Sequence, residues 1–168
     1  MPLNYTYINA ISDNFPNVGC HAIGDDAIYE NIVHDNGDPI PDKATLDALI
    51  AAKVKDHMWR QIQAERDRRK AGGVKVNGNW FHSDDPSRIQ QLGLMMMGAS
   101  MPPGIMWKTM SGTFVQMTPT LAQQIFQAVA AADQSIFAVA EQHKAAMMAS
   151  SDPAIYSFSS GWPLVYGE

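Results

Sequence analysis

The sequence predicts an α+β protein in which helices and β-hairpins alternate along the chain. Two long stretches carry apolar residues at three- and four-residue spacings, the pattern of amphipathic helices. Residues 74–82 and 105–117 each contain two short strand-like runs around a glycine turn, which is typical of a hairpin. The predicted order is a strand-rich N-terminal arm (1–41), a helix-hairpin-helix-hairpin-helix domain (42–151) and an aromatic C-terminal tail (152–168).

The N-terminal arm is predicted to be strand-rich. From Asn4 to Ile11 the tyrosines Tyr5 and Tyr7 alternate with polar residues, which favours a half-buried strand. A polar passage with Gly and Pro follows and is expected to be a loop. Residues 27–33 predict a second strand, and residues 34–38 predict a turn after it.

A long helix is predicted to begin after Asp42, which suits its N-cap. It ends in a basic last turn followed by Gly72-Gly73. Such a helix spans roughly 45 Å at 1.5 Å per residue, so we expect part of it to project or to pack on another chain. Its apolar stripe is Leu46, Leu49, Ile50, Val54, Met58 and Ile62.

Two hairpins flank a short helix in the prediction. Asn77-Gly78 is a strong signal for a two-residue hairpin turn. The run Ser83–Asp85 offers helix caps, Pro86 suits a first helical position, and the short helix should end at about Gly98. The second hairpin turns at Ser111-Gly112.

A second long helix is predicted from Thr118, its cap, and Pro119, at its first position, to about Ser151. Two sets of three apolar residues repeat every eleven residues, which keeps a nearly straight seam on a helix: Ile125, Ile136 and Met147, and Phe126, Phe137 and Met148. The apolar faces of both long helices exceed what two small hairpins can cover, so we expect self-association or a permanent partner. The residues expected to be buried at this interface are Ile125, Phe126, Ile136 and Phe137.

Composition excludes several classes of protein. The chain of 168 residues has 46% hydrophobic residues and no apolar run long enough for a transmembrane span. The net charge of −5 and the pI near 5.4 disfavour nucleic-acid binding. The first residues lack a secretory signal and Cys20 is the single cysteine, which predicts folding in a reducing cytoplasm. The 11 methionines suit either an irregular core or an adaptable docking surface.

Charge is segregated along the chain. Basic residues gather between Lys53 and Lys75, whereas residues 1–42 contain no Lys or Arg. We therefore expect the acidic arm to prefer a basic partner surface. Its acidic residues are Asp13, Asp25, Asp26, Glu30, Asp35, Asp38 and Asp42.

No motif for catalysis, phosphate binding or metal binding is recognised, so we predict neither an enzyme nor a cofactor. His82 near Asp84 and Asp85 suggests a metal site or an acid-base pair, but helix capping explains the carboxylates more simply. Residues 35–38 resemble the start of a calcium loop, but its spacing and terminal Glu are missing, so a turn is favoured.

Aromatic residues near both termini are the predicted partner contacts, because Trp and Tyr dominate interface energetics. For the tail, the alternative is that it folds back onto its own domain. The candidates are Tyr5, Tyr7, Tyr29, Tyr156, Phe158, Trp162 and Tyr166.

Several motifs follow one another in order between Ile62 and Ala149: RRKAGGVKV, the hairpin with NWFHSDD, SRIQQLGL, the WKT and GTFVQMT strands, and LAQQIFQAVAAADQSIFAVAE. In these features the stretch resembles a domain family of unassigned molecular function found in tail-fibre and tail-assembly proteins of tailed bacteriophages. The leading IYENIVHDNGDPIPDKATLDAL and the closing SSGWP are similar to flanks of such proteins.

The resemblance implies a location in a phage tail and carries no catalytic residue with it. Two roles follow. One is a virion component, made in the bacterial host cytoplasm, that joins or decorates tail-fibre or baseplate proteins. The alternative is an assembly chaperone that binds a fibre and is absent from the mature virion. An enzyme such as a wall hydrolase would need an acidic pair in a cleft or a metal site.

Overall fold

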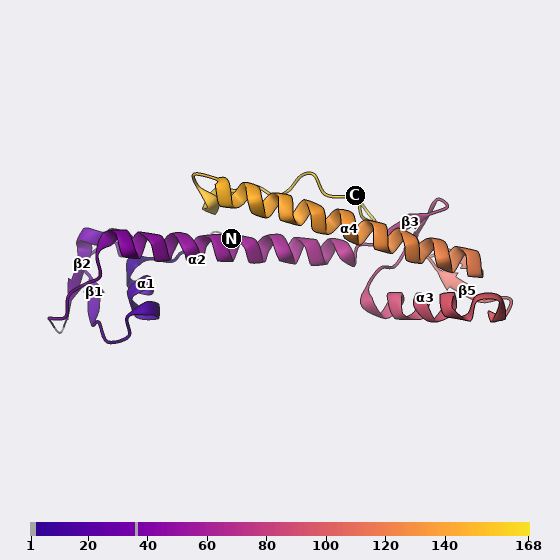
Figure 1. Ribbon diagram of the computed structural model, residues 1–168, viewed down its shortest axis with the longest axis horizontal. Coiled ribbons are helices and arrows are strands. Elements are labelled where there is room, and N and C mark those ends of the chain that lie inside the picture. The colour runs from indigo at the N-terminus through magenta and orange to yellow at the C-terminus, as the bar shows by residue number, and fades with distance from the viewer. Residues whose placement is uncertain (1–2, 36) are drawn as a thin grey trace. The chain divides into compact units, whose positions relative to one another are not determined.

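The computed structural model describes residues 3–35 and 37–168, which form two compact units. Unit 1 contains the described residues up to Gln61 together with Ala146–Tyr156. Unit 2 contains Ile62–Ala145 together with Ser157–Glu168. Two long helices, α2 (Lys43–Lys70) and α4 (Pro119–Ala149), each contribute to both units (Figure 1). The fold is α+β, as the sequence predicts.

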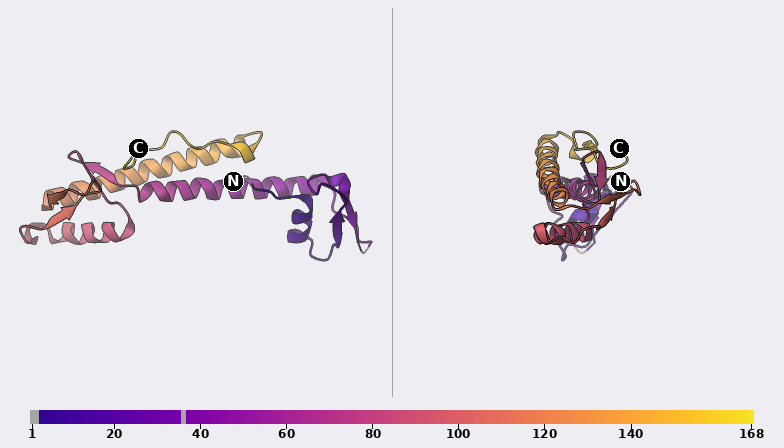
Figure 2. Two further views of the ribbon diagram at one scale, coloured as in Figure 1. Left: turned by 180° about the vertical axis from the view of Figure 1, so that it is seen from behind. Right: turned by 90° about the vertical axis from the view of Figure 1, so that its right-hand side faces the viewer.

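Unit 1 packs a small helix and a hairpin onto the start of α2. Its elements are α1 (Tyr7–Asn14), β1 (Cys20–Ala22), a 3₁₀ turn (Tyr29–Asn31) and β2 (Ile32–His34). Strand β2 pairs antiparallel with β1, and α1 lies beside this hairpin (Figure 1 and the left view of Figure 2). The buried residues of this core are Tyr7, Ala10, Ile11, Ile32 and Leu46.

The strand predicted from Asn4 to Ile11 is wrong, because most of that segment belongs to α1. The buried residues are Tyr7, Ala10 and Ile11, which share one face of a helix and cannot share one face of a strand. The helix start is fixed by Asn9, whose Oδ1 accepts hydrogen bonds from the Thr6 N–H and Oγ1, both at 3.0 Å. Thr6 Oγ1 also lies 3.1 Å from the Asp26 carboxylate.

The strand predicted over residues 27–33 is also largely wrong. Only its last residues enter a strand, Ile32–His34, after the 3₁₀ turn at Tyr29–Asn31. Its partner Cys20–Ala22 lies in the polar passage that was expected to be a loop. The predicted turn over residues 34–38 includes Asn36, which lies outside the described residues.

The structure confirms the helices and hairpins predicted between Asp42 and Ser151. Two hairpins, β3 (Val74–Val76) with β4 (Asn79–Phe81) and β5 (Met106–Lys108) with β6 (Phe114–Gln116), flank α3 (Asp85–Met97). At the first turn Asn77 and Gly78 both have positive φ, 49° and 83°, as a primed hairpin turn requires. Asp84 caps α3 by accepting from the Ser87 N–H, and this hydrogen bond lowers the Asp84 pKa.

The core of unit 2 lies between the first hairpin and α4. Partly buried residues of α3 and the second hairpin, among them Leu94 and Trp107, pack against it. Because a buried apolar side chain contributes on the order of 1.5–3 kcal/mol, this cluster is the main source of stability in the unit. Its buried residues are Val74, Val76, Phe81, Met117, Leu121, Ala122, Ile125 and Val129.

Arg88 joins three helices of unit 2. One guanidinium nitrogen donates to the Asp133 carboxylate at 2.6 Å, which links α3 to α4. Another donates to Asp133 at 2.9 Å and to the Lys70 carbonyl at 2.8 Å, at the end of α2. Arg88 Nε donates a fourth hydrogen bond, to the Ser83 carbonyl.

The C-terminal tail of unit 2 folds back onto its own unit. Trp162 is 9% exposed, donates from Nε1 to the Phe158 carbonyl at 2.7 Å and lies under the Arg69 guanidinium. The Tyr166 N–H donates to the Gly72 carbonyl at 2.9 Å. The Glu168 side chain accepts from Arg69, which itself is 7% exposed. Of the two alternatives for the tail, the structure shows folding back for this segment.

Replacing Trp162 with alanine should therefore destabilise unit 2. Loss of a buried Trp costs about 3 kcal/mol, so we expect a lower melting temperature and a lower urea midpoint. The matched control is Leu164→Ala in the same tail, because Leu164 is 72% exposed and its loss should cost less than about 0.5 kcal/mol. Equal melting temperatures for the two variants would contradict the burial of Trp162.

Arg88→Met should destabilise unit 2 by about 2 kcal/mol, the usual worth of hydrogen bonds to a charged group. Arg88→Lys should restore only part of this, because an ammonium cannot reproduce the forked contact with Asp133. The control is Lys75→Met, which replaces an exposed cation on β3. Urea titration of the three variants gives the comparison, and a Lys75→Met effect as large as that of Arg88→Met would refute this role for Arg88.

Candidate partner-binding site

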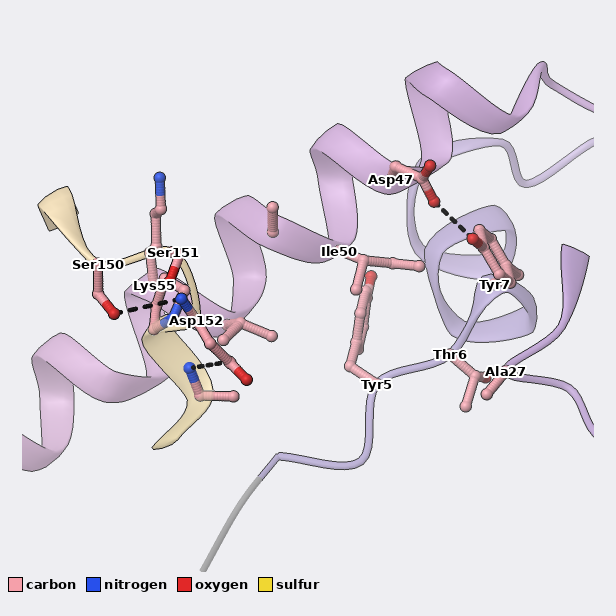
Figure 3. Close-up of a pocket in the computed structure, with 14 residues that line it drawn as sticks. Tyr5, Thr6, Tyr7, Ala27, Asp47, Ile50, Lys55, Ser150, Ser151 and Asp152 are labelled. Atoms are coloured by element: carbon pink, nitrogen blue, oxygen red, sulfur yellow. Dashed lines mark hydrogen bonds between the residues drawn. The ribbon is translucent and has the colours of Figure 1, made fainter. Parts of the chain in front are cut away.

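Unit 1 contains a pocket of about 470 Å³ that is lined by side chains from three segments (Figure 3). One wall comes from the N-terminal segment, with Tyr5 and Tyr7, and a second from α2, with Asp47 and Ile50. The opposite wall is residues 150–154, which follow α4. Apolar and polar groups alternate around it, which suits a polypeptide or another amphipathic ligand. The remaining lining residues are Thr6, Ala27, Ala51, Val54 and Lys55.

Tyr7 lies at one end of this pocket and is held by a charged network. Its hydroxyl donates to Asp47 Oδ1 at 2.5 Å, and Lys43 Nζ donates to Asp47 Oδ2 at 2.8 Å. The hydrogen bonds from Lys43 and Tyr7 lower the pKa of Asp47, and the same carboxylate raises the pKa values of Tyr7 and Lys43. The three groups therefore keep their usual charges at neutral pH, and the Tyr7 ring is fixed in position.

Tyr5 is held in a similar way. Its hydroxyl donates to Asp13 Oδ2 at 2.9 Å, and Lys53 Nζ lies 3.3 Å from the same oxygen. Lys53 also lies 5.0 Å from the centre of the Tyr5 ring, a cation–π distance. Burial and the Asp13 contact raise the pKa of Tyr5, while Tyr5 and Lys53 lower that of Asp13. Both tyrosines thus line the pocket with their hydroxyls already bonded. The half-buried Tyr5 leaves part of its ring for a ligand, whereas Tyr7 is buried.

The opposite wall is a capped turn. Asp152 Oδ1 accepts from the Ala154 N–H at 3.1 Å, and Ser150 Oγ accepts from the Asp152 N–H at 3.2 Å (Figure 3). These bonds use the polar side chains of the turn to hold its own backbone. The pocket therefore offers the accessible part of the Tyr5 ring and aliphatic surface for binding, together with charged groups.

The structure brings together some of the predicted contact residues and separates others. Tyr29 packs edge-on against Tyr7 at 5.5 Å, so Tyr5, Tyr7 and Tyr29 belong to one region of unit 1. Tyr7 itself is 7% exposed. The other predicted aromatics follow the segment Ser150–Ala154: Tyr156 belongs to unit 1, and Phe158, Trp162 and Tyr166 belong to unit 2.

The aromatics in unit 2 differ in exposure. Trp162 is buried in its own unit, so the prediction that it offers a free contact surface is corrected. Phe158 is half-buried and packs edge-on against His143. Tyr166 is 42% exposed and packs edge-on against Trp80 at 6.1 Å.

The four residues predicted to lie at a helix interface also differ in exposure. Ile125 and Ile136 are 0% and 2% exposed within the single chain, so no second chain is needed to bury them. Phe126 and Phe137 are 42% and 41% exposed. Phe137 is partly covered by Arg66, whose guanidinium lies 4.8 Å from the ring centre.

One apolar surface was not predicted as a site. Ile89, Leu92 and Met96 on α3 are 72%, 38% and 76% exposed and follow one another at i, i+3 and i+7. No Asp, Glu, Lys or Arg occurs between Ile89 and Trp107. That uncharged stretch is a signal in the sequence, but apolar residues occur on every side of this short helix, so periodicity did not identify the exposed face.

The residues described, 3–35 and 37–168, hold no group of three or more His, Cys, Asp or Glu placed to bind a metal ion. Within the same residues no helix is long and apolar enough to cross a membrane. Burial raises the pKa of the Cys20 thiol, which lowers its thiolate fraction at neutral pH.

The two units define an α+β protein with a tyrosine-lined pocket in unit 1 and exposed apolar residues on α3. Residues 51–160, well over half of the chain, match the family described as "Domain of unknown function (DUF4376)", and the chain belongs to that family. No curated protein and no solved structure matches the chain.

Tyr7→Phe should weaken the dependence of stability on acid pH. The pKa of Asp47 is lowered in the folded state, so its stabilising effect is present above its ordinary value of 3.8 and is lost as pH falls through the folded pKa. Removing one donor raises the folded pKa of Asp47, so the melting temperature should fall less steeply on acidification. Tyr166→Phe is the control. If it changes the slope of melting temperature against pH as much as Tyr7→Phe does, the hydrogen bond from Tyr7 to Asp47 is not the cause.

Proposed function

We propose that the protein is a structural component of a bacteriophage tail, which joins or decorates tail-fibre or baseplate proteins. The observation that carries the docking role is the exposed apolar stripe Ile89, Leu92 and Met96 on α3. Exposed contiguous apolar surface on a folded unit is typical of a protein-protein interface. The tail location is supported by the resemblance of residues 62–149 to a domain of tail proteins.

The rest of α3 supports the idea that the stripe is a contact surface. Arg88 and Gln91, on another face of the helix, are bonded within unit 2, Gln91 by donating to the His82 carbonyl at 2.8 Å. Met95 packs on the core cluster. Since the helix is held by these faces, the stripe is not needed to fix it. Met96 adds a flexible side chain that adapts to a partner surface.

Mass spectrometry of purified virions tests this function. Stoichiometric recovery with fibre or baseplate proteins is the expected result. Presence in infected cells together with absence from purified virions would replace it with the alternative role, an assembly chaperone that leaves before maturation. Detection in neither sample would remove the tail assignment.

The double variant Ile89→Asp with Met96→Asp should reduce incorporation into virions by about tenfold or more, because burying even one unpaired carboxylate at an interface costs several kcal/mol. Circular dichroism should show an unchanged fold, since both positions are exposed. The control is Gln134→Asp, at an exposed position of α4. Normal incorporation of the double variant would show that the stripe does not dock.

A further inference from the structure

The outer edge of β5 has backbone groups without partners. Thr109 N–H donates to the Thr113 carbonyl and Met117 N–H donates to the Ile105 carbonyl, both at 2.8 Å. With Trp107 opposite Val115, these bonds direct the odd-numbered residues of β5 toward β6. Met106 and Lys108 therefore direct their N–H and C=O groups away from the hairpin. Among the described residues, no backbone bond from these groups to another element is found, whereas the Met110 N–H, further along the same edge, donates to the Trp80 carbonyl at 2.9 Å. The edge is therefore free at Met106 and Lys108 only.

This free edge opens into a groove of about 480 Å³. One side is formed by β5, from Ile105 to Lys108, and the other by Ser87, Gln90 and Leu94 of α3. These α3 residues lie on a different helical face from the exposed stripe, so the groove is a separate surface. A strand edge beside a helix is an arrangement that accepts an added strand, since the edge supplies backbone hydrogen bonds and the helix supplies side-chain contacts.

The groove fits a single extended segment better than a second hairpin. Neighbouring strands lie about 4.8 Å apart, so an added strand would occupy the space directly between β5 and α3. The β5 edge of a second copy would bring its own β6 on the far side, where α3 already forms the wall. A lone strand therefore needs less room beside β5 than a second hairpin does, and we take a lone strand as the occupant.

The charges of the groove indicate what that strand carries. Lys108 is exposed, and within the described part of the chain no carboxylate lies within ion-pair distance of it. No Asp or Glu lines the groove, while His82 and Lys108 do. On the other face of β5, Trp107 and Ile105 pack with the core cluster. An added strand would therefore place an acidic residue beside Lys108 and apolar residues on the side of Trp107 and Leu94.

We propose that the groove between β5 and α3 binds an extended segment of a partner protein by strand addition, with acidic and apolar side chains in alternation. This inference concerns a surface other than the α3 stripe and does not depend on the phage-tail role. Peptide binding to the purified chain and recovery from virions are separate measurements, so either can fail alone.

The probe is a blocked synthetic peptide of alternating valine and glutamate, titrated against the full chain by isothermal calorimetry. Saturable binding at one site is expected. The same peptide with alternate backbone nitrogens methylated should not bind, because those positions can no longer donate to β5. Absence of saturable binding by the unmethylated peptide, or equal binding of both, overturns the proposal.

A pair of proline variants tests the edge itself. Met106→Pro removes an outward N–H on the groove side, and Gln116→Pro removes the corresponding outward N–H of β6 on the opposite edge. Met106→Pro should weaken peptide binding by about tenfold, since a hydrogen bond is lost and the ring obstructs the edge. Gln116→Pro should leave binding unchanged. If both variants weaken peptide binding equally and have equal melting temperatures, the peptide does not bind at the β5 edge.

A charge exchange tests the role of Lys108 without disturbing the backbone. Lys108→Glu should favour a valine-lysine peptide over the valine-glutamate peptide by about threefold, reversing the order seen with the native chain, as expected for an exposed ion pair. An unchanged order would exclude Lys108 from the contact. Light scattering of the native chain provides the last check, because a dimer that the peptide dissociates would identify a segment of a second copy as the occupant.

Discussion

The end of α2 depends on groups that come later in the chain. The last carbonyls of a helix have no partner inside it, and the Lys70 carbonyl accepts instead from Ser83 Oγ at 2.6 Å and from Arg88 at 2.8 Å. Ser83 Oγ in turn accepts from the Gly73 N–H at 2.9 Å. Because Ser83 and Arg88 also lie at the start of α3, these bonds fix the end of one helix to the beginning of the next. The first hairpin, which connects the two, is held at both of its ends.

This constraint also explains the exposed surfaces of α3. Arg88 and Gln91 hold the helix by one face, and Leu94 and Met95 pack toward the core. A helix fixed in this way has no further need of Ile89, Leu92 and Met96 for its own stability. The apolar stripe and the groove beside β5 are thus consequences of how the helix is anchored, and both remain available to partners.

Local signals predicted the helices and hairpins between Asp42 and Ser151 correctly, and the strands of the N-terminal arm largely incorrectly. The elements between Asp42 and Ser151 begin or end at strong capping and turn residues, such as Asp84 at a helix cap and Asn77-Gly78 at a hairpin turn. Each of these residues acts on its immediate neighbours in the chain. The N-terminal elements are short. Over so few residues, the alternation of Tyr5 and Tyr7 was consistent with a strand, whereas the deciding contact of Tyr7 is with Asp47 on another helix.

The candidate site could be predicted only in part, for a related reason. Sequence showed that Tyr5 and Tyr7 were suited to contacts, but the pocket also needs residues 150–154, which are distant along the chain. The aromatic tail posed the converse problem. The aromatic composition predicted that the tail packs against a protein surface. It did not distinguish contact of Trp162 with a partner from contact with its own chain. Arg69 and the close approach of Gly72 to Val165 decide this, and neither is visible from local pattern.

A protein that joins two others needs at least two surfaces of different chemistry, since identical surfaces would compete for one partner. In the role proposed, the tyrosine pocket of unit 1 would select by shape and apolar contact, because the hydroxyls of Tyr5 and Tyr7 are already bonded to Asp13 and Asp47. The groove of unit 2 offers unpaired backbone groups and the cation of Lys108, so it selects extended segments with acidic residues. If both are used, each contact can be weak alone. Linking two weak contacts in one chain raises the combined affinity by on the order of 10²–10⁴, which suits a part that must be correctly placed before it is held.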